Sequence, residues 1–78
     1  MTGVLRHWSQ RQFGFVRTTS SQGIYTDYFL HISNLKSGKP FVGSLVEFTP
    51  ASTQKGQIAV DAFVSALPAE IVALSGGN

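Results

Sequence analysis

Hydrophobic and polar residues alternate along most of the chain with the period of two that is typical of half-buried β-strands. The alternation is clearest where β-branched and aromatic residues are frequent, and Gly, Pro and Ser interrupt it at short intervals. The pattern predicts five strands, over residues 3–9, 12–18, 25–31, 43–50 and 57–66.

Short polar segments separate these strands. The expected connectors are a tight reversal at residues 10–11, a polar loop at 19–23, a long connector at 33–43 and a turn at 51–56. Residues 32–35 are expected to form one helical turn, and Gly38 and Pro40 argue against a helix or a central strand in the rest of the long connector. Five short strands without intervening helices predict an all-β fold, a small five-stranded antiparallel barrel, because closure removes exposed strand edges.

The chain length of 78 residues suits one domain. We expect the barrel over residues 1–66 and a C-terminal extension over 67–78. Pro68 at a first helical position and Glu70 close behind it favour one or two helical turns there. A helix that short is marginal alone, so the tail should either pack on the barrel or fray. The expected state is a monomer, with dimerisation through the tail as the alternative.

Composition excludes several classes of protein. With 42% hydrophobic and 13% charged residues the chain is too apolar to be disordered. The absence of cysteine excludes disulfides, thiolate metal sites and thiol catalysis. No apolar run approaches the roughly 18 residues of a membrane span and the start does not resemble a signal peptide, so we expect a soluble cytoplasmic protein. No catalytic or metal-binding motif is present, and we therefore expect no enzyme activity, no metal and no cofactor.

The net charge of +2 is modest, but the charges are unevenly placed. The first 25 residues contain three arginines, Arg6, Arg11 and Arg17, and no acidic residue. This placement allows a positive field on one side of the molecule, with an ordinary solvated surface as the alternative.

The second and third predicted strands carry apolar residues on both faces, although only one face of each strand can point into the core. One face carries Phe13, Phe15, Phe29 and His31, and the opposite face carries Val16, Tyr28 and Leu30. A small barrel has a single interior, and the second set fills it with ordinary core residues. The first set is therefore predicted to face solvent, unless the register is reversed, since a slip of one residue exchanges the faces.

An exposed group of rings beside arginines suits single-stranded nucleic acid. Unpaired bases stack on aromatic side chains with about 1–3 kcal/mol per base, while cations follow the phosphates. The same aromatic patch could instead dock a partner protein, and this is the alternative function.

Several segments resemble motifs of the cold-shock domain family. Residues 2–8 resemble its Gly-x-Val-Lys-Trp-Phe strand, 12–16 its Lys-Gly-Phe-Gly-Phe-Ile motif, 27–33 its Asp-Val-Phe-Val-His-Phe-Ser motif, and 43–48 and 55–60 its last two strands. The resemblance covers about residues 2–65, and the two central motifs in this order are its most specific part. It implies a barrel of the oligonucleotide/oligosaccharide-binding (OB) type. It also implies stacking of single-stranded RNA or DNA with low sequence specificity, and a role as an RNA chaperone or antiterminator.

The sequence departs from the family pattern at several positions. The first connector is one residue short, so that His7 falls where the family has Trp, and Trp8 where it has Phe. Ile32 replaces an aromatic residue, and Phe41 is expected to take the place of a core leucine. These differences predict a smaller stacking surface and weaker binding than in a full-pattern member.

The predicted nucleic-acid-binding residues fall into two groups. The first group is Arg6, Trp8, Arg11, Phe13, Phe15, Phe29 and His31; the second, less directly indicated, is His7, Arg17, Tyr25, Asp27, Lys36, Lys39 and Lys55. Three residues have a structural alternative. Trp8 could instead be a packing residue whose indole N–H bonds to the backbone. His31 could serve merely to cap the turn that follows it, and Asp27 merely to anchor the turn that precedes it.

Overall fold

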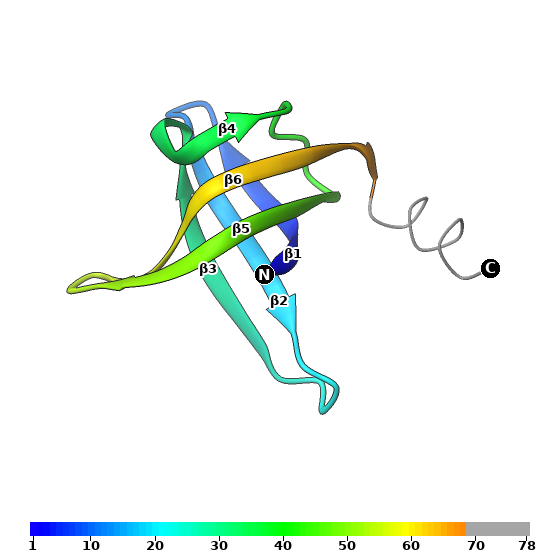
Figure 1. Cartoon of the computed structure of the whole chain (residues 1–78), viewed down its shortest axis with the longest axis vertical. Coiled ribbons are helices and arrows are strands. Elements are labelled where there is room, and N and C mark those ends of the chain that lie inside the picture. The colour runs from blue at the N-terminus through cyan, green and yellow to red at the C-terminus, as the bar shows by residue number, and fades with distance from the viewer. Residues whose placement is uncertain (69–78) are drawn as a thin grey trace.

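Six strands and one turn of 3₁₀ helix form the fold in the computed structural model, which describes residues 1–68 (Figure 1). The elements are β1 (Thr2–Ser9), β2 (Phe13–Thr19), β3 (Tyr25–His31), η1 (Ile32–Asn34), β4 (Leu35–Ser37), β5 (Ser44–Thr53) and β6 (Gly56–Pro68). Five of the strands correspond to the five predicted from the alternating pattern. The helical turn expected at residues 32–35 is η1.

The five long strands close into a barrel. β1 pairs antiparallel with both β2 and β5, β2 pairs with β3, and β5 pairs with β6. A parallel contact between β3 and β6, where Phe29 lies opposite Ile58, completes the ring. In Figure 1, β5 and β6 cross in front of β1, β2 and β3. The prediction of a small all-β barrel of the OB type is confirmed.

The sixth strand, β4, lies within the long connector, where the alternating pattern predicts no strand. Leu35 pairs with Ala62 of β6 and packs against the core. Gly38 then ends the strand with a φ of 88°, in the left-handed region. A Cβ at this position would collide with the backbone oxygen of Val64, so the chain passes directly over β6 here. Three residues are too few to show an alternating pattern, and this is why the sequence did not reveal the strand.

The β5–β6 hairpin is longer than predicted. Pairing continues through Ala51 opposite Ile58 to Thr53 opposite Gly56, so the expected turn at residues 51–56 is reduced to its tip. At the other end, β6 runs to Pro68, past the predicted domain boundary at residue 66. The rest of the predicted extension, including most of its helical turns and the dimerisation surface, lies outside the described residues.

The core consists of the inward-facing residues of all five barrel strands. It contains Leu5, Val16, Tyr28, Leu30, Val46, Phe48, Ala59, Ala62 and Val64. The rings of Tyr28 and Phe48 meet at a centroid distance of 5.0 Å. Burial of each large apolar side chain contributes about 1.5–3 kcal/mol relative to exposure. Val16, Tyr28 and Leu30 are thus inside, as the face argument predicted, and the reversed register is excluded.

The expected core position of Phe41 is wrong. Its side chain is 63% exposed in the β4–β5 loop. The backbone N–H of Phe41 donates to the Lys39 carbonyl, and its own carbonyl accepts from the Ser44 N–H, at 2.9 and 3.1 Å. These bonds fold the loop outside the barrel, and the inward-facing positions of β5 begin only at Ser44, which is itself buried.

Candidate nucleic-acid interface

The β2–β3 hairpin presents its aromatic residues on the outer surface of the barrel. Its outward-facing pairs are Phe13–His31, Phe15–Phe29, Arg17–Asp27 and Thr19–Tyr25, and its inward-facing pairs include Gly14–Leu30 and Val16–Tyr28. Residues directly opposite each other in an antiparallel pair share a face. The register therefore places all four predicted stacking residues of these two strands on one side.

The rings of this group contact one another. Phe29 lies at its centre, with ring centroids 5.5 Å from Phe13, 5.8 Å from Phe15 and 6.4 Å from His31. Phe15 is 38% exposed, His31 is exposed, and Phe13 and Phe29 are half-buried. These separations are those of favourable aromatic pairs, so the rings form one continuous surface that remains open to solvent.

A β-bulge in β1 adds a fifth ring. Leu5 lies opposite Val16 and His7 lies opposite Phe15, so Arg6 is an extra residue on the β1 side. Such a bulge reverses which face the following side chains occupy. The His7 ring consequently lies on the outer surface, 6.3 Å from that of Phe15. We call the outward group of His7, Phe13, Phe15, Phe29 and His31 the aromatic platform.

The same bulge places Trp8 on the inner side, away from the aromatic platform. Trp8 lies opposite Gly14 and packs against the core. An added Cβ at Gly14 would lie 2.8 Å from Cε3 of the Trp8 ring, so this glycine makes room for the indole. Of the two alternatives for Trp8, the structure supports packing, and its predicted place at the platform edge is taken by His7.

His31 caps the following turn, as its structural alternative predicted, and its ring also lies on the aromatic platform. Its Nδ1 caps η1 by accepting a hydrogen bond from the backbone N–H of Ser33 at 3.1 Å, and it lies 2.9 Å from the Ser33 hydroxyl. The ring also contacts Phe29. Because Nδ1 is an acceptor, the proton of the neutral imidazole is assigned to Nε2. The cap therefore fixes the orientation of the ring as well as its tautomer.

Beyond Phe15 and Phe29, the outer face continues with an ion pair. Arg17 donates from Nε to Asp27 Oδ1 at 2.8 Å and from Nη2 to Oδ2 at 3.2 Å. The Arg17 guanidinium carbon also lies 3.8 Å from the centroid of the Tyr25 ring. The hydrogen bond from Arg17, followed by the charges of Arg17 and Arg6, lowers the pKa of Asp27 despite opposing desolvation. Asp27 thus anchors Arg17.

The remaining predicted cations divide into three groups. Arg6, at the β1 bulge, and Arg11, in the β1–β2 turn, are exposed and belong to the segments that carry His7 and Phe13. Lys39 lies in the β4–β5 loop and Lys55 in the β5–β6 turn. Lys36 lies 3.7 Å from Asp61 of β6 and belongs to a different surface. Arg6 and Arg11 thus lie on the segments that carry the platform rings, whereas Lys36, Lys39 and Lys55 lie outside β1, β2 and β3.

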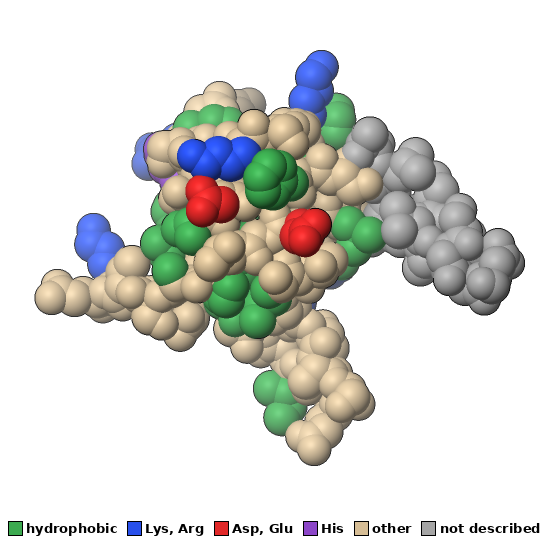
Figure 2. Space-filling view, in the orientation of Figure 1, with side chains coloured by type: hydrophobic (Ala, Val, Ile, Leu, Met, Phe, Trp, Pro, Cys, Tyr) green, Lys and Arg blue, Asp and Glu red, His purple; other side chains and the backbone are tan. Residues whose placement is uncertain are grey.

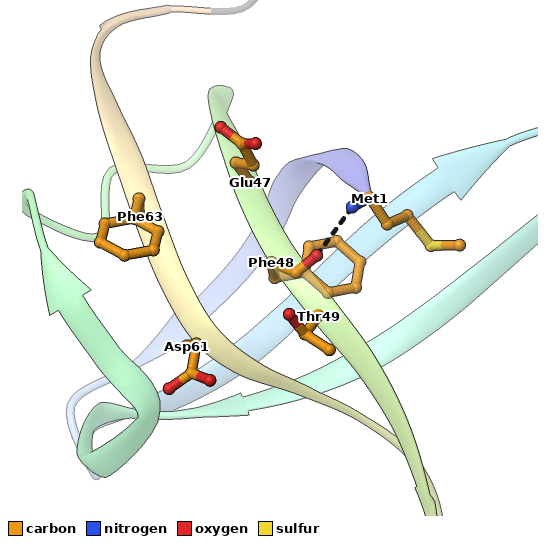
Figure 3. A pocket seen from close by; sticks show the side chains of 6 residues that line it. All are labelled: Met1, Glu47, Phe48, Thr49, Asp61 and Phe63. Atoms are coloured by element: carbon orange, nitrogen blue, oxygen red, sulfur yellow. Dashed lines mark hydrogen bonds between the residues drawn. The ribbon is translucent and has the colours of Figure 1, made fainter.

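The surface of β5 and β6 differs in charge from the aromatic platform. Phe63 is 49% exposed there, and Glu47 lies opposite it on β5. Figure 2 shows acidic side chains and an exposed hydrophobic side chain on this face. Phe63, Glu47 and Asp61 line an open depression of about 400 Å³ (Figure 3). Lys36, which pairs with Asp61, and the N-terminal ammonium of Met1 offset these two carboxylates, so this face carries no excess of positive charge to attract phosphates.

One neighbour of the aromatic platform could not be identified from the sequence. Ile58 of β6 lies beside Phe29 through the parallel contact that closes the barrel, and it is half-buried. The two residues are far apart in the chain, and no local pattern predicts which residue of β6 meets β3.

Neither a metal site nor a membrane-spanning helix is found in the part of the chain that the structure describes. Within residues 1–68, no three His, Asp or Glu side chains gather closely enough to hold a metal ion. The same residues contain no helix with the length and apolar character that a bilayer span requires. Comparison with models of known protein families finds no match, and comparison with curated proteins finds none either.

Proposed function

We propose that this protein binds single-stranded RNA or DNA by stacking unpaired bases on the aromatic platform, with little sequence preference. The observation that carries the proposal is the set of contiguous, outward-facing rings at Phe13, Phe15 and Phe29, on a barrel whose core is filled without them. Bases of every kind have a π-face, so stacking tolerates any sequence. Arg6 and Arg11 hold the sugar–phosphate backbone.

The proposed activity is that of a binding protein in the cytoplasm, not of an enzyme. Preferential binding to single strands shifts RNA hairpins toward the unpaired state by mass action and needs no ATP. This is the physical basis of an RNA chaperone or antitermination role, which the resemblance to the cold-shock domain family implies. Two of the five platform rings are imidazoles, so we expect weaker stacking than on a platform of larger rings.

The test is a titration of a fluorescently labelled oligothymidine, its RNA counterpart and a duplex of the same length, followed by fluorescence anisotropy. Replacement of Phe15 or Phe29 by alanine should weaken single-strand binding by about 5- to 150-fold, which corresponds to about 1–3 kcal/mol per base. Phe63→Ala is the matched control, because it removes a comparably exposed phenyl ring from the face formed by β5 and β6. Circular dichroism would show that each variant remains folded.

Two results would contradict the proposal. One is equal binding of duplex and single strand, and the other is unchanged affinity in folded Phe15→Ala and Phe29→Ala proteins. Salt dependence separates the alternative, a protein-interaction module on the same patch. Two phosphate contacts, from Arg6 and Arg11, predict a slope of about −1.4 in log affinity against log salt for single strands. Apolar docking of a partner protein predicts a slope near zero.

A further inference from the structure

The outer face of the β2–β3 hairpin extends past the aromatic platform. The next outward pair after Phe15–Phe29 is Arg17–Asp27, and Thr19–Tyr25 follows it. Successive outward pairs lie about 6.7 Å apart along a strand pair. A single strand that follows the platform toward the hairpin therefore meets Arg17 directly after the phenyl rings.

The guanidinium of Arg17 is held in one orientation by its neighbours. The two hydrogen bonds to Asp27 fix the plane of the group, because a guanidinium and a carboxylate that are bonded through two parallel contacts are coplanar. The Tyr25 ring supports the group from one side at 3.8 Å. The Arg17 side chain is nevertheless 33% exposed. A flat, positioned surface therefore remains accessible from solvent.

The charge of this group is already compensated. Asp27 neutralises Arg17 at hydrogen-bond distance, and a neutral pair attracts a phosphate much less than a free cation does. The planar face of a guanidinium, in contrast, stacks on nucleobases whether or not its edge is bonded to a carboxylate. The contacts of Arg17 thus favour base stacking over phosphate binding as its use in a nucleic-acid-binding protein.

We propose that Arg17 is a further base-stacking site, whose guanidinium face takes an unpaired nucleobase next to those on Phe15 and Phe29. Asp27 and Tyr25 act as positioning residues that hold the guanidinium flat. This inference rests on the proposed function and extends the site by one base toward the β2–β3 turn. It assigns Arg17 to the bases, whereas Arg6 and Arg11 remain with the phosphates.

Arginine-to-lysine substitution separates the two roles, because lysine keeps the charge but has neither the planar face nor the two-pronged edge. In the oligothymidine titration, Arg17→Lys should weaken binding at least fivefold, about as much as Arg17→Ala. The matched control is Lys36→Ala, which removes an ion-paired cation from the β5–β6 side and should stay within twofold of the unchanged protein. Tyr25→Phe keeps the supporting ring and should retain affinity, whereas Tyr25→Ala should lose severalfold.

The salt dependence gives an independent measurement. If Arg17 stacks on a base, the charge-neutral double variant Arg17→Ala/Asp27→Asn leaves the slope of log affinity against log salt unchanged. Loss of a phosphate contact would make the slope shallower by about 0.7. A shallower slope in Arg17→Ala/Asp27→Asn, or near-normal affinity in Arg17→Lys, would overturn the inference.

The failure of this inference is distinguishable from the failure of the proposed function. If the unchanged protein does not bind single strands, or Phe15→Ala binds normally, the proposed function itself is wrong. If those tests succeed and only Arg17→Lys behaves like the unchanged protein, the aromatic platform stands and Arg17 is not part of it. Thermal unfolding of each variant confirms that the affinity change does not reflect loss of the fold.

Discussion

Gly14 is the residue at which the fold and the site are most tightly coupled, and Gly14→Ala tests this coupling. The glycine lies on the inner face of β2, directly opposite Trp8. A Cβ at this position would lie 2.8 Å from the Trp8 ring and 2.9 Å from the His7 carbonyl carbon, and still closer to the carbonyl oxygen. Its φ is not in the left-handed region, so the substitution acts through steric overlap alone.

The loss of stability caused by Gly14→Ala depends on how far β1 and β2 must separate to accommodate the added methyl group. Overpacking of a close-packed site costs about 1–3 kcal/mol, and each β1–β2 hydrogen bond lost when the strands separate adds about 1 kcal/mol. We therefore expect Gly14→Ala to lower the free energy of unfolding by about 2–4 kcal/mol. The total free energy of unfolding of a domain of this size is roughly 4–12 kcal/mol. The unfolding temperature should fall by about 8–32 °C, since 1 kcal/mol corresponds to roughly 4–8 °C.

Urea unfolding monitored by Trp8 fluorescence measures this change, because Trp8 is half-buried against the core when the protein is folded. Gly23→Ala is the matched control. Gly23 has a φ of 82° and no atom within 4 Å of an added Cβ, so this variant carries only the left-handed backbone penalty of about 1–2 kcal/mol. If Gly14→Ala is no more destabilising than Gly23→Ala, steric overlap between the added methyl group and its β1 neighbours is refuted.

Three further predictions concern single residues. Because Arg17 lowers the pKa of Asp27, their contribution to stability is complete above the ordinary aspartate pKa of about 3.9 and is lost as the pH falls through the lowered value. Urea unfolding across this range should therefore show a smaller loss of stability on acidification in Asp27→Asn; an equal loss would contradict the pairing. Phe41→Ser should change stability by less than about 0.5 kcal/mol, since the ring is exposed, and a loss above about 2 kcal/mol would return Phe41 to the core. Gln12 has a φ of 69°, so Gln12→Val should lower the unfolding temperature and Gln12→Gly should not; equal effects of the two substitutions would exclude backbone strain at this turn.

The alternating pattern was sufficient to predict the barrel and the main part of the aromatic platform. In β2 and β3 the period of two is unbroken, and only one of the two faces could fill a small core. The assignment of Val16 and Leu30 to the interior thus placed Phe15 and Phe29 outside without any knowledge of how the strands pair. The prediction succeeded because it depended on local geometry and on the requirement for a single core.

The features that the sequence did not reveal depend on contacts between distant segments. The parallel contact of Phe29 with Ile58 and the short strand that pairs Leu35 with Ala62 are set by closure of the barrel. The exposure of Phe41 results from a loop whose backbone bonds fold it away from the interior. In each case the residue type is compatible with several positions, and only the three-dimensional arrangement selects one.

The bulge at Arg6 shows how one extra residue changes the proposed site. With uninterrupted alternation from the buried Leu5, His7 would face inward and Trp8 would join the aromatic platform; the bulge exchanges them. The sequence does not locate the bulge, because a tryptophan suits either face and a histidine tolerates both. The exchange gives the platform edge an imidazole and gives the core an indole, which requires a glycine opposite it. The weaker stacking that we propose and the need for Gly14 are therefore two consequences of the same backbone feature, and a variant that removed the bulge should change both together.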